Sequence, residues 1–192
     1  PRSASKDAIV NGRNLLRRRN CVGCHEMEGD GGGYRDLVEE PSLAPPLLTP
    51  EGAKVQPDWL YAFFRGPITI RPWLQVRMPT FGLEDEHWNE VIDYFAAVSD
   101  VGGPFRTHQP TATDETTRVG EELFELLQCQ SCHVLDTIPA DRDLSNLAPD
   151  LRMVRERLQP DWVLEWLIRP LDIQPGTGMP TFFTEYPVSL YP

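Results

Sequence analysis

The chain has 192 residues, of which 40% are hydrophobic, and carries a formal net charge of −11. This length allows one ordinary domain or two small ones, and the acidic balance excludes a typical nucleic-acid partner. No apolar run approaches the roughly 18 residues that a membrane-spanning helix requires, so we expect no membrane span in these 192 residues. The 19 prolines are about twice the usual share and favour short helices separated by loops.

The first half of the chain predicts three helices. Apolar residues recur at helical spacing over residues 6–19, and residues 57–65 fit a short helix with a proline in its first turn. The third helix covers residues 84–98, where three acidic residues precede an apolar stripe. Residues 26–56 are rich in glycine and proline and are expected to form loops.

The second half begins in the same way. After a linker at residues 105–113, we expect helices over residues 114–128 and 160–168. Only thirteen residues follow Met179, and several are prolines, so we expect no counterpart of the helix over residues 84–98. The apolar stripe over residues 114–128 would then lack its usual cover. Either the sequence is a piece of a longer chain, which we expect, or another surface covers the stripe.

A Cys-x-x-Cys-His motif follows the first helix of each half. The motif residues are Cys21, Cys24 and His25 in the first half and Cys129, Cys132 and His133 in the second. This pattern is the attachment signature of c-type haem. Two thiols about one helical turn apart bond to the vinyl groups of one porphyrin, and the next imidazole binds the iron.

Three other uses of these cysteines fit less well. A four-cysteine zinc site places its two pairs roughly 15–20 residues apart, whereas more than a hundred residues separate Cys24 from Cys129. A thioredoxin-like pair requires a βαβ setting, which the helix pattern does not offer. A disulfide framework leaves both histidines unexplained. We therefore predict two covalently bound haem c groups, each with its iron.

The two motifs belong to an internal repeat. They lie 108 residues apart, and Gly12 matches Gly120 at the same offset. The offset is 104 where Leu43-Ala44-Pro45 matches Leu147-Ala148-Pro149, 103 at Gln-Pro-Asp-Trp, and 101 at Met-Pro-Thr-Phe. Small loop insertions explain this drift. We predict two homologous domains, at residues 1–104 and 114–192, joined by the linker at 105–113.

In this combination of motifs the chain resembles class I cytochromes c in tandem. The shared pattern is a first helix, Cys-x-x-Cys-His, an Ala-Pro segment, a short middle helix, a Met-Pro loop and a closing helix. The first copy matches all of it, and the second copy matches all but the closing helix. The resemblance implies an all-α fold of two such domains, the second one incomplete.

The same resemblance implies further site residues. In the family, the methionine of the Met-Pro loop is the second axial ligand, which corresponds to Met78 and Met179 here. A proline carbonyl orients the proximal imidazole, and this maps to Pro45 and Pro149. A tryptophan near a haem propionate maps to Trp59 and Trp162, for which packing alone is the alternative. The later arginines Arg65 and Arg169 could pair with propionates or be solvated.

Electron transfer is the function that the resemblance implies. The protein would be an electron carrier, not an enzyme, acting as a shuttle or as the cytochrome segment of a larger respiratory or dehydrogenase complex, including one docked at a membrane. Its partners would be redox proteins, and its location periplasmic or otherwise exported. The alternatives are a di-haem peroxidase, which needs one iron with a displaceable ligand, and a gas sensor.

Charge differs beside the two motifs. Arg13, Arg17, Arg18 and Arg19 precede the first, whereas Glu121, Glu122 and Glu125 precede the second. This polarity would steer different redox partners to the two haem edges, or it marks two solvated helix faces.

Overall fold

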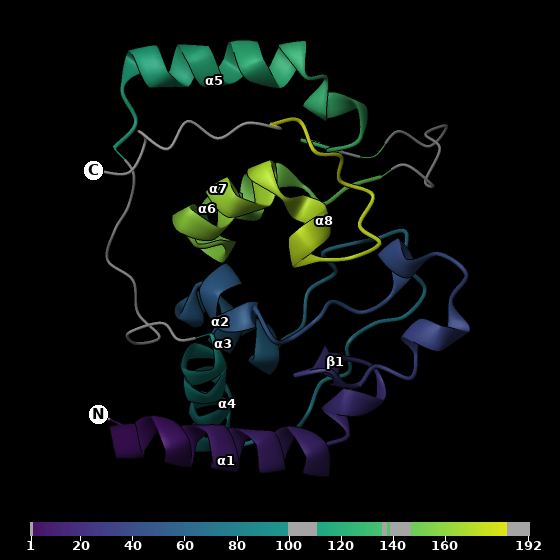
Figure 1. Cartoon of the computed structure of the whole chain (residues 1–192), viewed down its shortest axis with the longest axis vertical. Helices are drawn as coiled ribbons and strands as arrows, with labels where there is room; N and C mark the ends of the chain where they lie inside the picture. Colours follow the sequence, from purple (N-terminus) through teal and green to yellow (C-terminus); the bar gives the residue numbers. More distant parts are fainter. Residues whose placement is uncertain (1, 100–110, 136–137, 139–146, 184–192) are drawn as a thin grey trace.

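The computed structural model describes residues 2–99, 111–135, 138 and 147–183, and within them it is mostly helical (Figure 1). The sheet found in these residues is a single antiparallel pair, β1 (Glu26–Met27) and β2 (Asp30–Gly31). The predicted all-α fold class is therefore confirmed. We call residues 1–104 the first repeat and residues 114–192 the second repeat.

In the first repeat, α1, α3 and α4 lie close to the three predicted helices, and short elements occupy the stretch expected to be loops. The helices are α1 (Arg2–Arg18), α2 (Glu51–Lys54), α3 (Pro57–Arg65) and α4 (Asp85–Val98). Short 3₁₀ turns are η1 (Cys21–Gly23), η2 (Arg35–Leu37) and η3 (Pro41–Leu43). Helix α3 begins with Pro57, whose missing N–H costs nothing in a first turn.

The second repeat follows a similar order. It contains α5 (Asp114–Leu126), η4 (Cys129–Ser131), η6 (Leu151–Met153), α6 (Val154–Arg157), α7 (Pro160–Ile168) and α8 (Pro170–Ile173). Thr113 caps α5, since its hydroxyl accepts from the backbone N–H of Thr116. Most of the predicted linker and the last nine residues lie outside the described residues, as does the region where a closing helix was not expected.

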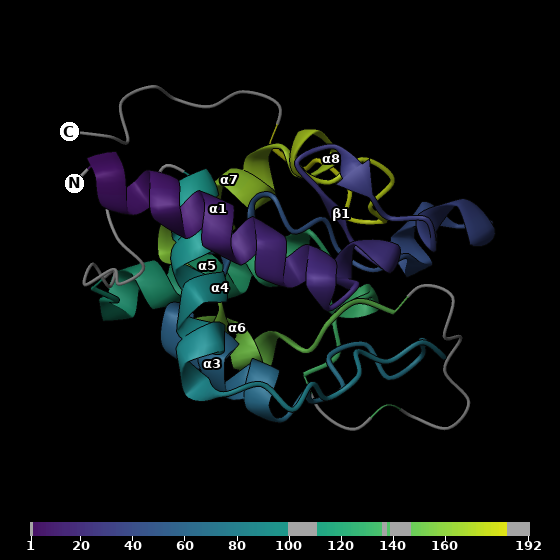
Figure 2. The same ribbon diagram turned by 90° about the horizontal axis from the view of Figure 1, so that it is seen from below.

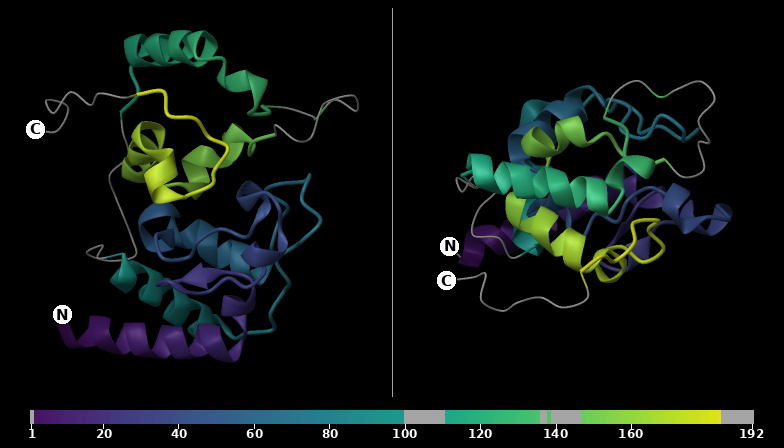
Figure 3. Two further views of the ribbon diagram at one scale, coloured as in Figure 1. Left: turned by 45° about the vertical axis from the view of Figure 1, so that its right-hand side comes forward. Right: turned by 90° about the horizontal axis from the view of Figure 1, so that it is seen from above.

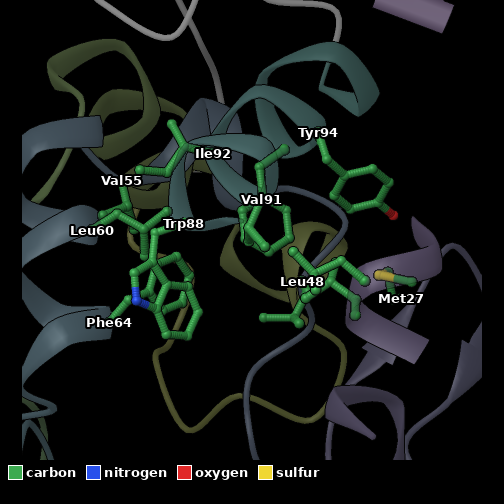
Figure 4. Close-up of a cluster of buried hydrophobic side chains, with 12 residues drawn as sticks. Met27, Leu48, Val55, Leu60, Phe64, Trp88, Val91, Ile92 and Tyr94 are labelled. Carbon is green, nitrogen blue, oxygen red and sulfur yellow. The ribbon is translucent and has the colours of Figure 1, made fainter. Parts of the chain in front are cut away.

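The first repeat has a continuous hydrophobic core between α1, α3 and α4. Helix α1 crosses α4 (Figure 2), and Gly12 makes the close approach possible, because a Cβ there would lie 2.2 Å from the Cβ of Tyr94. Beneath this crossing, Phe64 stacks on Trp88 with ring centroids 4.7 Å apart (Figure 4). The helix pair thus closes one side of the first repeat.

Helix α5 has a different environment. None of its residues is buried, and Leu123 is 40% exposed, whereas Leu15 at the equivalent position of α1 is 8% exposed. A Cβ on Gly120 would meet no atom of the described residues within 4 Å. The apolar stripe of α5 is therefore at least partly exposed among the described residues, at the end of the molecule opposite α1 (Figure 3).

The two repeats meet through α2 and α3 on one side and α6 and α7 on the other (Figure 1). Val55 and Leu158 form an antiparallel bridge. The Gln56 N–H donates to the Arg157 carbonyl, and the Gln159 N–H donates to the Lys54 carbonyl, both at 2.8 Å. Since Gln56 matches Gln159 and Lys54 matches Arg157 at offset 103, the contact is reciprocal, as in a two-fold dimer interface.

Candidate haem sites

Both Cys-x-x-Cys-His segments fold into the same tight turn. The residue before each first cysteine, Asn20 or Gln128, has a positive φ of 57° or 54° and ends the preceding helix. The His25 N–H then donates to the Cys21 carbonyl and the His133 N–H to the Cys129 carbonyl, each at 2.9 Å. All four cysteines, which lie within the described residues, are free thiols. Each turn therefore brings two thiols and one imidazole together.

A backbone carbonyl orients each imidazole. The Nδ1–H of His25 donates to the carbonyl of Pro46, and that of His133 donates to the carbonyl of Pro149, both at 2.8 Å. A carbonyl can only accept, so Nδ1 carries the proton and Nε2 keeps its lone pair for a metal. Burial also lowers the pKa of His25, which favours the neutral, metal-binding ring.

The carbonyl expected from Pro45 comes instead from Pro46, so the assignment of Pro45 was wrong by one residue. The acceptor pair Pro46 and Pro149 has offset 103, the offset of the following Gln-Pro-Asp-Trp segment. Pro45 matches Ala148, whose N–H donates to the Cys132 carbonyl at 3.0 Å. Two consecutive prolines in the first repeat shifted the sequence alignment, whereas Pro149 was correctly placed.

The two candidate axial methionines lie in loops of similar sequence. Met78 is partly buried against the core of the first repeat. Met179 is half-buried, and its N–H donates to the Thr177 hydroxyl at 3.3 Å. Met27, two residues after His25, is 1% exposed and belongs to the core. Ligation by Met78 and Met179 stays a prediction.

The matched tryptophans have matched surroundings. Trp59 stacks on Phe63 and Trp162 on Trp166, with ring centroids 5.0 Å apart in each pair. The indole N–H of Trp162 is buried and has no acceptor among the described residues. A buried donor without a partner is costly, which favours a missing acceptor over packing alone at Trp162.

The arginines considered as propionate partners are engaged elsewhere. Arg65 lies 3.6 Å from Asp85 and Arg169 lies 2.7 Å from Glu165, all of them at the surface. Arg13 and Arg17, from the basic cluster before the first motif, pair with Glu28 and Asp30.

Sequence reasoning missed three cations that are largely buried near the first site. Lys54 contacts Glu51 at 3.1 Å, and the guanidinium of Arg71 donates to the carbonyls of Ser42 and Ala44 at 2.8 and 3.0 Å. Burial lowers the pKa of Arg71 to about 10 and also lowers the pKa of Lys54 and of Arg157. The sequence signal that could have found two of them is that Lys54 and Arg157 occupy equivalent positions in the two repeats.

Residues 7–95 match the family described as cytochrome C oxidase, cbb3-type, subunit III, over slightly less than half of the chain. The first repeat is therefore similar to a cytochrome c domain over these residues. Among curated proteins and among solved structures, none matches the chain significantly. In the described residues, no helix is long and apolar enough to cross a membrane, and no group of three or more His, Cys, Asp and Glu forms a metal site.

A cytochrome c domain implies haem c, and the residues present fit that group. Free thiols and an oriented imidazole supply the attachment and one iron ligand. The buried N–H groups of Trp162 and of the Arg157 Nε lack acceptors among the described residues, as expected where carboxylates of a bound group belong.

Proposed function

We propose that the chain carries single electrons through two haem c groups, one in each repeat. The attachment turns support this most directly. Both repeats have the same backbone bonds through the Cys-x-x-Cys-His segment and the same imidazole-to-carbonyl bond. A second repeat that had lost its haem would have no need to keep this geometry. The two domains would be residues 1–104 and 114–192, with 105–113 as the linker.

In this proposal, each haem is bound by a matched set of residues. Cys21 and Cys24 would attach the first haem and Cys129 and Cys132 the second, with His25 and His133 as proximal ligands. Met78 and Met179 would be the opposite ligands. Each bound haem would supply one-electron Fe(III)/Fe(II) chemistry, and a thioether ligand favours the reduced iron.

The protein's own residues would set the conditions of that chemistry. The Pro46 and Pro149 carbonyls fix the ring angle of the two imidazoles and raise their basicity. The apolar core formed by α1, α3 and α4 limits water around the first site. Apolar surroundings would keep solvent reorganisation small when an electron enters or leaves, which suits an electron carrier.

The family match supports a proposal for the physiological setting. Since the first repeat is similar to a subunit of a cbb3-type oxidase, we propose that the protein works as a segment or partner of a respiratory complex, exchanging electrons with redox proteins. A shuttle between such partners is the second form of the same function. Cytochrome c domains are typically exported, so a periplasmic location is proposed.

A redox titration of the purified holoprotein tests this function. We expect two electrons to be taken up per chain, in two one-electron steps, without turnover of hydrogen peroxide. Uptake of one electron per chain would refute the di-haem proposal. Peroxide turnover by the half-reduced protein would instead favour the peroxidase alternative.

Replacing Met78 tests the proposed axial ligation. We expect Met78→Ala to open the sixth position of the first iron, lower the potential of that haem and allow carbon monoxide to bind. Visible and near-infrared absorption report the loss of sulfur ligation. Met153→Leu is the matched control and should change neither property. An unchanged near-infrared band in Met78→Ala would show that Met78 is not a ligand.

A further inference from the structure

Three positively charged side chains are largely buried at the contact between the two repeats. Lys54 is 8% exposed, and Arg71 and Arg157 are also largely withdrawn from solvent. We call these three residues the interface cations. Lys54 and Arg71 come from the first repeat and Arg157 comes from the second. Burying charge is expensive unless an opposite charge lies beside it.

The interface cations exceed the carboxylates near them. Among the described residues, Glu51 is the carboxylate that interacts with Lys54 and with Arg157, and Arg71 interacts with Arg157 without a carboxylate of its own. The interface cations therefore outnumber the carboxylate that interacts with them among the described residues. Buried cations in excess imply anions that those residues do not supply.

A cation from each repeat lies over a tryptophan ring of the other repeat. The Lys54 ammonium lies 5.7 Å from the centroid of the Trp162 ring, and the Arg157 guanidinium lies 5.3 Å from that of Trp59. Lys54 matches Arg157 and Trp59 matches Trp162 in the sequence repeat, so the two contacts are equivalent. They are reciprocal in the same way as the backbone bonds of Gln56 and Gln159. Arg157, although it belongs to the second repeat, therefore lies among residues of the first.

The geometry also points to the chemical class of the missing partner. The Nε of Arg157 is a buried donor with no acceptor among the described residues. Lys54, Arg71 and Glu51 also interact electrostatically with His25, the proximal imidazole of the first site. Donors and positive charge beside this imidazole fit carboxylates, which are the anionic groups of a haem.

We propose that Arg157 of the second repeat completes the carboxylate-binding site of the haem in the first repeat, together with Lys54 and Arg71. The second repeat then has a role beyond any haem of its own, since its fold places a cation beside the first haem. This inference rests on haem binding by the first repeat, and it does not require the second haem of the proposed function.

The consequence is a raised reduction potential at the first haem. A buried cation stabilises the reduced iron relative to the oxidised iron, which carries one more positive charge. Removing Arg157 should therefore lower the midpoint potential of the haem bound at Cys21 and Cys24, although Arg157 lies in the other repeat.

Spectroelectrochemical titration of Arg157→Met tests the proposal. Arg155→Met is the matched control, because Arg155 lies on the same short helix α6, is exposed and carries the same charge. We expect the midpoint potential of the first haem to fall several-fold further in Arg157→Met than in Arg155→Met. Arg157→Lys should keep most of the midpoint potential, since a positive charge stays near the site. If Arg157 acted through packing alone, the potential would not depend on whether the replacement is charged.

Equal shifts of the midpoints in Arg157→Met and Arg155→Met would overturn the proposal. If Arg157→Met does not fold, the same comparison is made with Arg157→Gln, which keeps a polar side chain of intermediate length. The variant Cys129→Ala/Cys132→Ala assigns the affected midpoint to the first haem. A chain that contains one haem in total would refute the di-haem function and still leave the effect of Arg157 measurable.

Discussion

A single carboxylate, Glu28, ties the start of the first repeat to its closing helix. It accepts from the guanidinium of Arg13 at 2.7 Å and from the hydroxyl of Tyr94 at 2.9 Å. The bond from Arg13, followed by the bond from Tyr94, lowers the pKa of Glu28. Burial, followed by the hydrogen bond to Glu28, raises the pKa of Tyr94. Glu28 thus anchors the crossing of α1 and α4 beside the first attachment turn.

We expect Glu28→Gln to destabilise the protein by about 1 kcal/mol, because a partly exposed ion pair and a charge-assisted hydrogen bond are lost. The folded pKa lies below the ordinary value of 4.5. The contribution is therefore complete above that value and is lost as the pH falls through the folded pKa. Urea unfolding at pH 7 and pH 3 measures it. Glu90→Gln, on the exposed side of α4, should have little effect, and equal effects of both variants would contradict this role.

The site was predictable wherever a residue's chemistry shows in the sequence. The spacing of cysteine and histidine located both Cys-x-x-Cys-His turns, and haem attachment at these turns stays a prediction. The proline carbonyl was misplaced at Pro45 because a backbone acceptor has no sequence signature, so its position depended on an alignment of loops. Lys54 and Arg157 were missed because their burial depends on contacts between residues about a hundred positions apart.

At the scale of elements, Gly12 and Gly120 occupy equivalent positions in different environments. A Cβ at Gly12 would collide with Tyr94 of α4, whereas the position of Gly120 is open among the described residues. Gly12→Ala should destabilise the protein by roughly 1–3 kcal/mol through overpacking. Gly120→Ala should stabilise it by up to about 1 kcal/mol through helix propensity.

Thermal unfolding of the two glycine variants checks this difference. Opposite signs are expected, with Gly12→Ala also weakening the contact between α1 and α4. If Gly120→Ala destabilised the protein as strongly as Gly12→Ala, another helix would have to cover α5.

Helices with a strong apolar period were predicted closely, and α3 and α7 match their predicted limits. The short helices α2, α6 and α8, each of four residues, were not predicted, since such a segment has too few residues to show a period. Two of them, α2 and α6, carry Lys54 and Arg157, so the elements that join the repeats were the least visible in the sequence.

At the scale of the whole molecule, the two sequence repeats share a reciprocal contact. The backbone exchange at Gln56 and Gln159 and the crossed cations place the proximal region of the first site next to the second repeat. If both repeats bind haem, the charges at this contact would act on both haems. The charge of one repeat would then tune the potential of the other.

The mass of the intact holoprotein tests the central claim most directly. We expect two covalently attached haems per chain, reduced to one in Cys129→Ala/Cys132→Ala and to one in Cys21→Ala/Cys24→Ala. A chain that carries a single haem, unaffected by the loss of Cys129 and Cys132, would contradict the account.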